Sequence, residues 1–161
     1  MIEDIVKRTN PLPSKSKLIV FGGGYTGQHL ARVVQALGNK VLCSRRKKNS
    51  KGADFIFDHD VQLSKEILDD ATHILSCIPP SSEGHDPLLK QVKSQLLTAK
   101  KLQWIGYLST TGVYGDSKGA WVDENTIPKP KQSRSIRRLS CEKEWLATGL
   151  PLQILRLPGI Y

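Results

Sequence analysis

Hydrophobic positions along the chain fall into short runs separated by polar, glycine-rich or helix-spaced stretches. Short apolar runs that are closed by glycine, proline or charged residues are typical of buried strands. By this pattern we expect six strands, at residues 17–21, 40–44, 54–57, 72–78, 103–109 and 152–157. Because most of these runs are apolar throughout rather than alternating, they favour a parallel sheet that is covered on both faces.

Apolar residues at helical spacing separate most of these runs. The stretch after the first strand places four of them at i, i+3, i+4 and i+7, which are Leu30, Val33, Val34 and Leu37. A short helix is expected after Ser64, whose hydroxyl can cap it. Asp86 and Pro87 suit the cap and first turn of a longer helix, with apolar residues at 88, 89, 92, 96 and 97. A last helix is predicted near residues 134–148.

This alternation of strands and helices is typical of the α/β class, in which helices cover both faces of a parallel sheet. We therefore predict a Rossmann-type doubly wound sheet of about six strands in the order 3-2-1-4-5-6. The 161 residues are expected to form one domain, with residues 1–16 as an N-terminal extension.

The chain is strongly basic, with 24 lysines and arginines against 15 acidic residues and a net charge of +9. Such an excess attracts anions, including nucleic acids and phosphorylated small molecules. One basic cluster comprises Arg45–Lys48 with Lys51, and a second comprises Arg134, Arg137 and Arg138. The alternative is that these residues are solvated surface charge.

Cysteine usage and hydropathy narrow the class of protein further. Cys43, Cys77 and Cys141 are widely spaced and form no C-x-x-C pair, and the four histidines are scattered. We therefore expect neither a disulfide framework nor a metal site, as in a reducing compartment. The sequence shows no signal-peptide core and no apolar run of membrane-spanning length, which predicts a cytoplasmic protein without a membrane partner.

A glycine cluster directly follows the first predicted strand. Gly22-Gly23-Gly24-Tyr25-Thr26-Gly27 matches the pattern G-x-G-x-x-G. In a dinucleotide-binding loop the first glycine permits the tight turn, the second lets the pyrophosphate approach, and the third lets helix and strand pack closely. The start of the following helix then faces the negative charge. We interpret the loop as a pyrophosphate site, with a simple structural turn as the alternative; its binding residues are Gly22, Gly24, Tyr25, Thr26 and Gly27.

The end of the second predicted strand indicates which dinucleotide is bound. An acidic residue there would hold the ribose hydroxyl of NAD, but the chain has Ser44, Arg45 and Arg46. A hydroxyl followed by two guanidinium groups suits a 2′-phosphate. The sequence therefore favours NADP, with NAD as the alternative, and Arg45 is the residue expected to contribute most.

The segment YLSTTGVYGD at residues 107–116 resembles the NAD(P)-dependent epimerase/dehydratase family, the extended and atypical branch of the short-chain dehydrogenases/reductases. Members end the fifth strand in a hydroxyl-rich run before Val-Tyr-Gly, often with Asp-Glu later, as at Asp123-Glu124. The segment LRLPGIY at residues 155–161 resembles their sixth strand and the turn beside the nicotinamide. With the glycine loop, the resemblance covers nearly the whole chain.

The resemblance implies roles for further residues. Thr110 lies four residues before the Tyr-Gly pair and would be the catalytic hydroxyl, which hydrogen-bonds the substrate oxygen as charge develops. The alternative is that Thr110 only ends a strand. Asp58 is suggested as an adenine contact, with Asp60 nearly as good. The other cofactor contacts implied are Cys77, Ile78, Pro79, Ser109 and Pro158.

Two features depart from the family pattern. Members carry Tyr-x-x-x-Lys on the last helix, as general acid/base and its lysine partner, but alignment on Glu144 places Ile136 and Ser140 there. Arg137 or Arg138 could hold a phosphate, yet arginine stays charged and carries protons poorly. The chain also stops at Tyr161, where members continue into a substrate-binding region, so we expect either a fragment or a protein reduced to cofactor binding.

Two functions are therefore open. The first is the NADP-binding domain of an atypical epimerase/dehydratase or reductase acting on a sugar nucleotide or a similar small carbonyl or hydroxyl compound. The second is a catalytically silent module that senses NADP(H) or serves as a scaffold. Nucleic-acid binding is disfavoured because no recognised motif is present, and by analogy the last two helices could pair subunits into a homodimer.

Overall fold

The computed structural model describes residues 2–47, 52–58, 61 and 63–159. Its six strands form one parallel sheet in the order β3-β2-β1-β4-β5-β6, which confirms the predicted Rossmann-type topology. The strands are β1 (Lys17–Phe21), β2 (Lys40–Arg45), β3 (Phe55–Ile56), β4 (His73–Ser76), β5 (Trp104–Thr110) and β6 (Leu152–Leu157).

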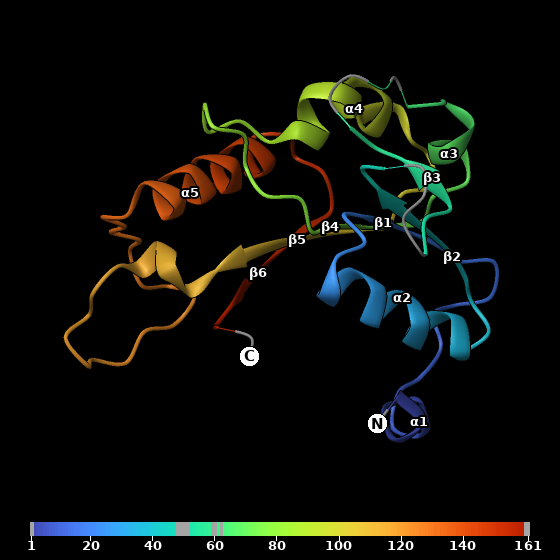
Figure 1. The fold of residues 1–161 in the computed structure, drawn as a ribbon, viewed down its shortest axis with the longest axis horizontal. Helices are drawn as coiled ribbons and strands as arrows, with labels where there is room; N and C mark the ends of the chain where they lie inside the picture. The colour runs from blue at the N-terminus through green and yellow to red at the C-terminus, as the bar shows by residue number, and fades with distance from the viewer. Residues whose placement is uncertain (1, 48–51, 59–60, 62, 160–161) are drawn as a thin grey trace.

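Helices lie on both faces of this sheet (Figure 1). Helix α2 lies on one face, whereas α4 and α5 lie on the other. None of the helices among the described residues has the length and apolar character needed to cross a bilayer. The helices are α1 (Ile2–Lys7), α2 (Tyr25–Ala36), α3 (Glu66–Asp69), α4 (Pro87–Thr98) and α5 (Ser133–Leu146), with a 3₁₀ turn, η1 (Thr111–Tyr114).

The alternation of side chains along β1 divides the core into two layers. Ile19 and Phe21 pack in the cluster that contains residues of α4 and α5, whereas Leu18 and Val20 pack against residues of α2. All four side chains are buried. The central strand is therefore covered on both faces, as its apolar sequence predicts.

Two strands are shorter than predicted. β3 keeps Phe55 and Ile56 but not the flanking residues of the expected 54–57. Phe57, just after β3, packs its ring edge-on against Phe21, with centroids 5.1 Å apart, and its N–H donates to the Arg45 carbonyl at 3.0 Å. β4 ends at Ser76 rather than at 78, and after two further residues come Pro79 and Pro80, which cannot donate to a sheet.

The predicted helices are present, but some of their predicted buried residues and caps are wrong. Leu30 and Leu97 are exposed, at 36% and 52% of their surface, although both were expected on apolar stripes. In α2 the buried face is instead Gly27, Ala31, Val33 and Val34. The Ser64 hydroxyl donates to Glu66 rather than capping α3, whose N-cap position is Lys65. Helix α1 and the turn η1 were not predicted.

Candidate cofactor-binding site

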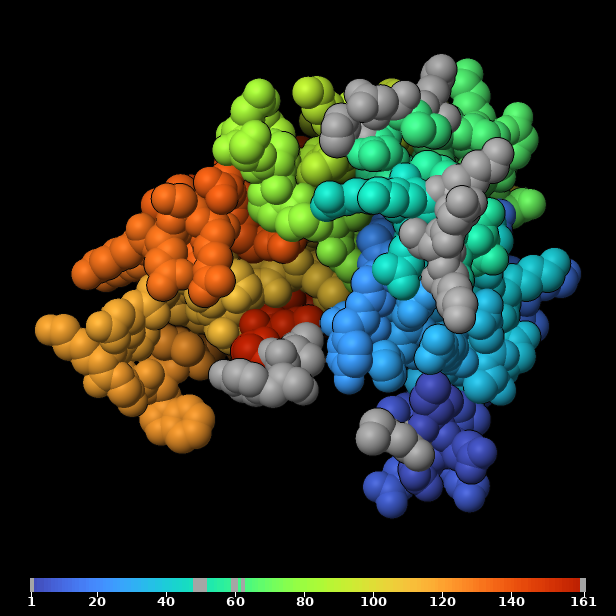
Figure 2. Space-filling model, viewed as in Figure 1, coloured from blue at the N-terminus to red at the C-terminus, as the bar shows by residue number. Residues whose placement is uncertain are grey.

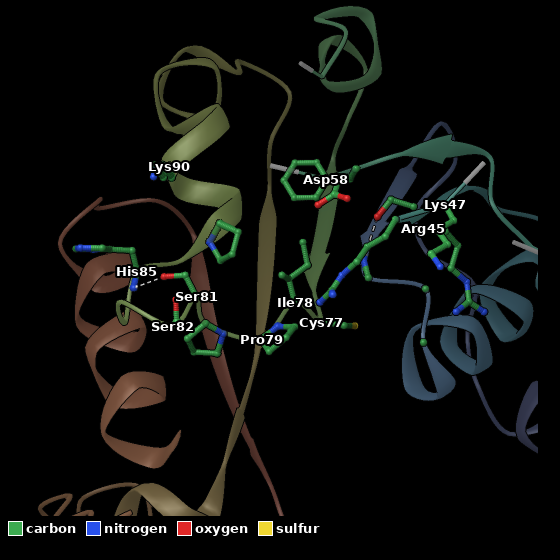
Figure 3. A pocket seen from close by; sticks show the side chains of 18 of the residues that line it. Arg45, Lys47, Asp58, Cys77, Ile78, Pro79, Ser81, Ser82, His85 and Lys90 are labelled. Carbon is green, nitrogen blue, oxygen red and sulfur yellow. Dashed lines mark hydrogen bonds between the residues drawn. The ribbon is translucent and has the colours of Figure 1, made fainter. Parts of the chain in front are cut away.

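A cavity of about 780 Å³ opens at the carboxyl ends of the central strands. In Figure 2 the start of α2 (blue) and the segment after β4 (light green) border the hollow on this face. Figure 3 shows Arg45, Lys47 and Asp58 on one side of it, with Ser81, His85 and Lys90 on the other. The predicted residues that line it are Gly22, Gly24, Ser44, Arg45, Arg46, Asp58, Cys77, Ile78 and Pro79.

The remaining predicted residues do not line this cavity. Tyr25, Thr26 and Gly27 form the first turn of α2, directly after the lining residue Gly24. Ser109 and Thr110 end β5, and Pro158 follows β6. The cavity therefore brings together the predicted residues that follow or end β1, β2, β3 and β4, whereas those in the first turn of α2 and at the ends of β5 and β6 do not line it. Asp60, Lys48 and Lys51 lie outside the described residues.

The glycine loop is fixed by hydrogen bonds to the end of β2. Gly22 has a φ of +90°, which favours glycine, and its N–H donates to Ser44 Oγ at 2.9 Å. The Gly23 N–H donates to the Ser44 carbonyl at 2.8 Å, and the Gly24 N–H donates to the Gly22 carbonyl at 2.7 Å. Ser44, predicted as a phosphate contact, is therefore buried and holds the loop in place.

With these loop amides bonded, the backbone N–H groups open to a ligand are those in the first turn of α2. The N–H groups of Tyr25, Thr26 and Gly27 have no intrahelical acceptor, as at any helix start. The N-cap residue Gly24 provides no side-chain cap, and a Cβ built on it would meet no described atom within 4 Å. An uncapped helix N-terminus beside an open cavity suits an anion such as pyrophosphate.

Two glycines of the loop are required by close packing. A Cβ on Gly27 would lie 2.6 Å from the Gly22 carbonyl oxygen and 3.0 Å from a methyl carbon of Val20. This agrees with the packing role predicted for Gly27. A Cβ on Gly23 would lie 2.5 Å from Cys43 Sγ, a constraint that sequence reasoning missed because the motif leaves this position free.

Basic side chains dominate the β2 side of the cavity. Arg45, Arg46 and Lys47 all line it, and Lys90 joins them from α4. The Nε of Arg45 is buried and has no hydrogen-bond partner among the described residues. A buried guanidinium nitrogen without a partner carries a desolvation cost that an incoming anion would offset.

The opposite wall is the segment that joins β4 to α4, and Arg138 of α5 fastens its start. The Nη1 of Arg138 donates to the carbonyls of Ile78 and Leu108, at 3.0 Å each, and to the Tyr107 hydroxyl at 3.1 Å. This guanidinium ties helix α5 to the ends of β4 and β5. The Nη1 of Arg138 thus holds the protein together, and the suggestion that this residue holds a phosphate stays a prediction for the rest of its guanidinium group.

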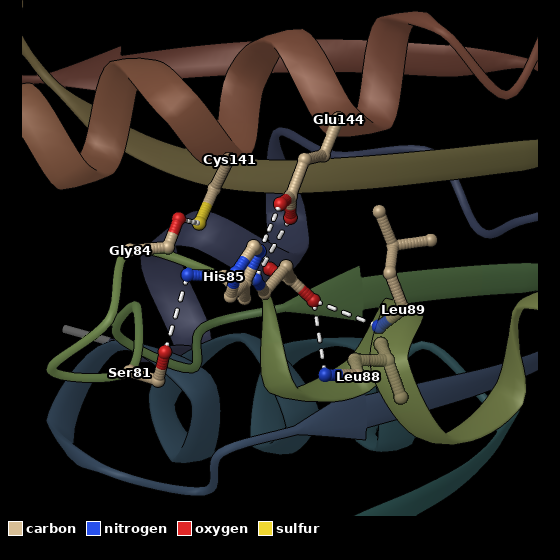
Figure 4. A network of polar contacts seen from close by, with 8 residues as sticks. Ser81, Gly84, His85, Leu88, Leu89, Cys141 and Glu144 are labelled. Carbon is tan, nitrogen blue, oxygen red and sulfur yellow. Dashed lines mark hydrogen bonds and ion pairs between the residues drawn. The ribbon is translucent and has the colours of Figure 1, made fainter.

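Glu144 of α5 fastens the far end of the same segment (Figure 4). One carboxylate oxygen bonds His85 Nδ1 at 2.7 Å, and the other accepts the Asp86 N–H at 2.9 Å. Asp86 caps α4 as predicted, accepting the N–H groups of Leu88 and Leu89 at 2.9 Å each. Burial raises the pKa of Asp86. Helix α5 thus holds the wall of the cavity.

Cys77, the cysteine on the cavity wall, is not a reactive thiol. Burial raises the pKa of Cys77 to about 12, so its side chain is a neutral thiol near pH 7. Within the described residues, no group of three or more His, Cys, Asp or Glu side chains could hold a metal ion. The wall offers apolar contact rather than a nucleophile.

The residues at the predicted catalytic positions lie beside η1 and on α5. The Thr110 Oγ1 accepts the Gly112 N–H at 3.1 Å and so caps the 3₁₀ turn. The Ser109 hydroxyl donates to Glu142, which is 1% exposed. Ile136 and Ser140, which stand at the Tyr and Lys positions, are exposed.

A buried ion pair joins α5 to β6 beside Thr110. Arg156 donates to both carboxylate oxygens of Glu142, from Nε at 3.1 Å and from Nη2 at 2.8 Å. Its Nη1 donates to the Tyr114 hydroxyl at 2.9 Å. The Glu142 carboxylate raises the pKa of Arg156. No sequence pattern indicates this network, because its members lie on four separate elements.

No protein-family model matches the sequence, and no curated protein matches it either. Solved structures are similar. A conserved protein of unknown function from Silicibacter pomeroyi is 38% identical, with a TM-score of 0.81, over 91% of this chain and 53% of that one. A protein assigned as an NAD-dependent epimerase/dehydratase from Methylobacillus flagellatus is 32% identical, with a TM-score of 0.75, over 92% of this chain and 56% of that one.

A UDP-glucuronic acid 4-epimerase from Bacillus cereus is 24% identical with a TM-score of 0.70, over 90% of this chain and 57% of that one, and shares the fold. The chain therefore spans a little over half the length of each of these proteins. The resemblance predicted from the sequence is confirmed: structural neighbours of the chain are NAD-dependent epimerase/dehydratase proteins.

Proposed function

We propose that the chain is an NADP(H)-binding Rossmann domain. The observation that carries this proposal is a cavity flanked by the uncapped start of α2 and by Arg45, whose buried Nε has no partner among the described residues. The first would bind the pyrophosphate, and the second a 2′-phosphate at the end of β2. Cys77, Ile78 and Pro79 would form the opposite wall, and Asp58 would lie on the adenine side.

NAD is the alternative cofactor. The Bacillus cereus UDP-glucuronic acid 4-epimerase structure is a complex with NAD. An NAD site needs an acceptor for the ribose hydroxyls at the end of the second strand. The residues at this place in the chain are Ser44, Arg45 and Arg46, and the Ser44 hydroxyl already accepts the Gly22 N–H. This chemistry supports NADP over NAD.

For the whole protein we propose an epimerase/dehydratase or reductase activity on a sugar nucleotide or a similar small carbonyl or hydroxyl compound. The bound cofactor would supply hydride transfer. Thr110 would polarise the substrate oxygen: its oxygen accepts the Gly112 N–H, so its hydroxyl proton is free to be donated. Ser109 would not share this role, because its hydroxyl donates to Glu142.

A catalytically silent cofactor-binding module is the second candidate, and helix α5 supports it. Arg138, Glu142 and Glu144 of this helix are all engaged in bonds that hold the fold together. The positions of the absent acid/base pair, Ile136 and Ser140, are exposed. Turnover on a panel of carbonyl compounds would separate the two candidates, and Thr110→Val would abolish it without weakening cofactor binding.

Arg45→Ala tests the cofactor assignment. We expect it to weaken NADPH binding by roughly 10- to 100-fold, the value of one or two charge-assisted hydrogen bonds, and to leave NADH binding nearly unchanged. Titration of nicotinamide fluorescence measures both affinities. Lys93→Ala is the matched control, because Lys93 is an exposed cation that does not line the cavity. Equal losses for NADPH and NADH would reject NADP as the preferred cofactor.

A further inference from the structure

A second hollow of about 440 Å³ adjoins the cavity at the end of β2. It lies between α2 and the segment around β3, and Arg45 lines both spaces. Its polar lining comes from Gln28, Arg32 and Gln35 of α2, and from Arg45 and Asp54. Gln28, Arg32 and Gln35 were not predicted to contact a ligand.

The polar residues of α2 share one face of the helix. Gln28, Arg32 and Gln35 follow at i, i+4 and i+7, so their side chains lie one above the other. This places Arg32 one turn beyond Gln28, which itself follows the open amides at the start of the helix. A group bound against these amides and extending along α2 would reach Arg32 next.

The charges of the hollow favour a phosphate. Arg32 and Arg45 bring two guanidinium groups to it, and Asp54 brings one carboxylate. The Asp54 Oδ2 accepts the Cys43 N–H at 2.7 Å, so part of this carboxylate is engaged by the backbone of β2. The Nε of Arg45 has no partner among the described residues. Two guanidinium groups beside one space suit the planar, paired recognition of a phosphate monoester.

We propose that this hollow binds a phosphate monoester, the 2′-phosphate of NADP(H), between Arg45 and Arg32. Arg32 is then a second residue that determines cofactor specificity. The proposal rests on the NADP(H)-binding function proposed above. It assigns the discrimination against NAD to helix α2 as well as to the end of β2.

Arg32→Ala tests the proposal, and because Arg32 is exposed on α2 the variant should fold normally. We expect NADPH affinity to fall roughly tenfold, the effect of one lost charge-assisted hydrogen bond, with NADH affinity unchanged. The isolated probe 2′-AMP should lose affinity in parallel, whereas 5′-AMP should not. Lys93→Ala again serves as the control for loss of one positive charge.

A second variant at the same site should change NADPH affinity in the opposite direction. Asp54→Asn removes the negative charge and keeps a side-chain oxygen for the Cys43 N–H, so NADPH affinity should rise. If NADPH binds but neither variant changes its affinity relative to NADH, the hollow does not hold the 2′-phosphate. If neither NADPH nor NADH binds to the wild-type protein, the proposed function itself fails.

Discussion

Glu142→Ala is expected to lower the free energy of unfolding by about 3–5 kcal/mol, the usual cost of removing one partner of a buried ion pair. The carboxylate is 1% exposed and accepts two bonds from Arg156 and one from Ser109. Its removal leaves a guanidinium that is 19% exposed without its carboxylate partner. Urea unfolding followed by circular dichroism measures the loss.

Lys143→Ala is the matched control for this prediction. Lys143 is the next residue on α5 and is exposed, so its removal should change stability by less than about 0.5 kcal/mol. Arg156→Ala should destabilise as strongly as Glu142→Ala, because it leaves the buried carboxylate without its cationic partner and with only the Ser109 hydroxyl as a donor. A loss below about 1 kcal/mol for Glu142→Ala would show that the pair is not formed as described.

Gly27→Val is expected to destabilise the fold and to abolish NADPH binding. A Cβ at residue 27 would lie 2.6 Å from the Gly22 carbonyl oxygen, so the backbone of the glycine loop must move. Overpacking of this kind costs about 1–3 kcal/mol, and the shift displaces the loop that places the open amides of α2. Thermal unfolding and an NADPH titration together measure the two effects.

Gly24→Ala provides the contrast within the same loop. A Cβ at this position meets no described atom within 4 Å, and the φ of −71° suits alanine. The melting temperature should therefore stay at the wild-type value. The methyl group would stand on the open side of the glycine loop, where a pyrophosphate would approach. Normal stability and normal NADPH affinity in Gly27→Val would contradict the packing described for the loop.

The features of this structure that were predicted correctly are those that depend on local sequence patterns. The run at β1, the glycine loop and the Asp86-Pro87 helix start each depend on neighbours in sequence, and all three lie where the pattern placed them. The strand order follows from the handedness of parallel crossovers. Helix α2 was placed correctly, but its buried face is rotated from the predicted stripe: Ala31 is buried and Leu30 is exposed.

The roles of polar side chains could not be predicted in the same way. Ser44 and Arg138 were predicted only as candidate phosphate contacts, but Ser44 also holds the glycine loop and Arg138 also joins β4, β5 and α5. Their partners lie 22 and 60 residues away in sequence, respectively. Such pairings depend on which strands become neighbours, and residue spacing does not encode them. The resemblance named Thr110 but gave no hint of the ion pair of Glu142 beside it.

Amide hydrogen exchange with and without NADPH tests the central claim most directly. With free NADPH at tenfold its dissociation constant, binding should slow exchange roughly tenfold wherever opening requires release of the cofactor. We expect this protection at residues 22–28 and 77–79, with none in α1 or in residues 115–132. Unchanged exchange at the glycine loop at millimolar NADPH and NADH would contradict the assignment of this cavity as a dinucleotide site.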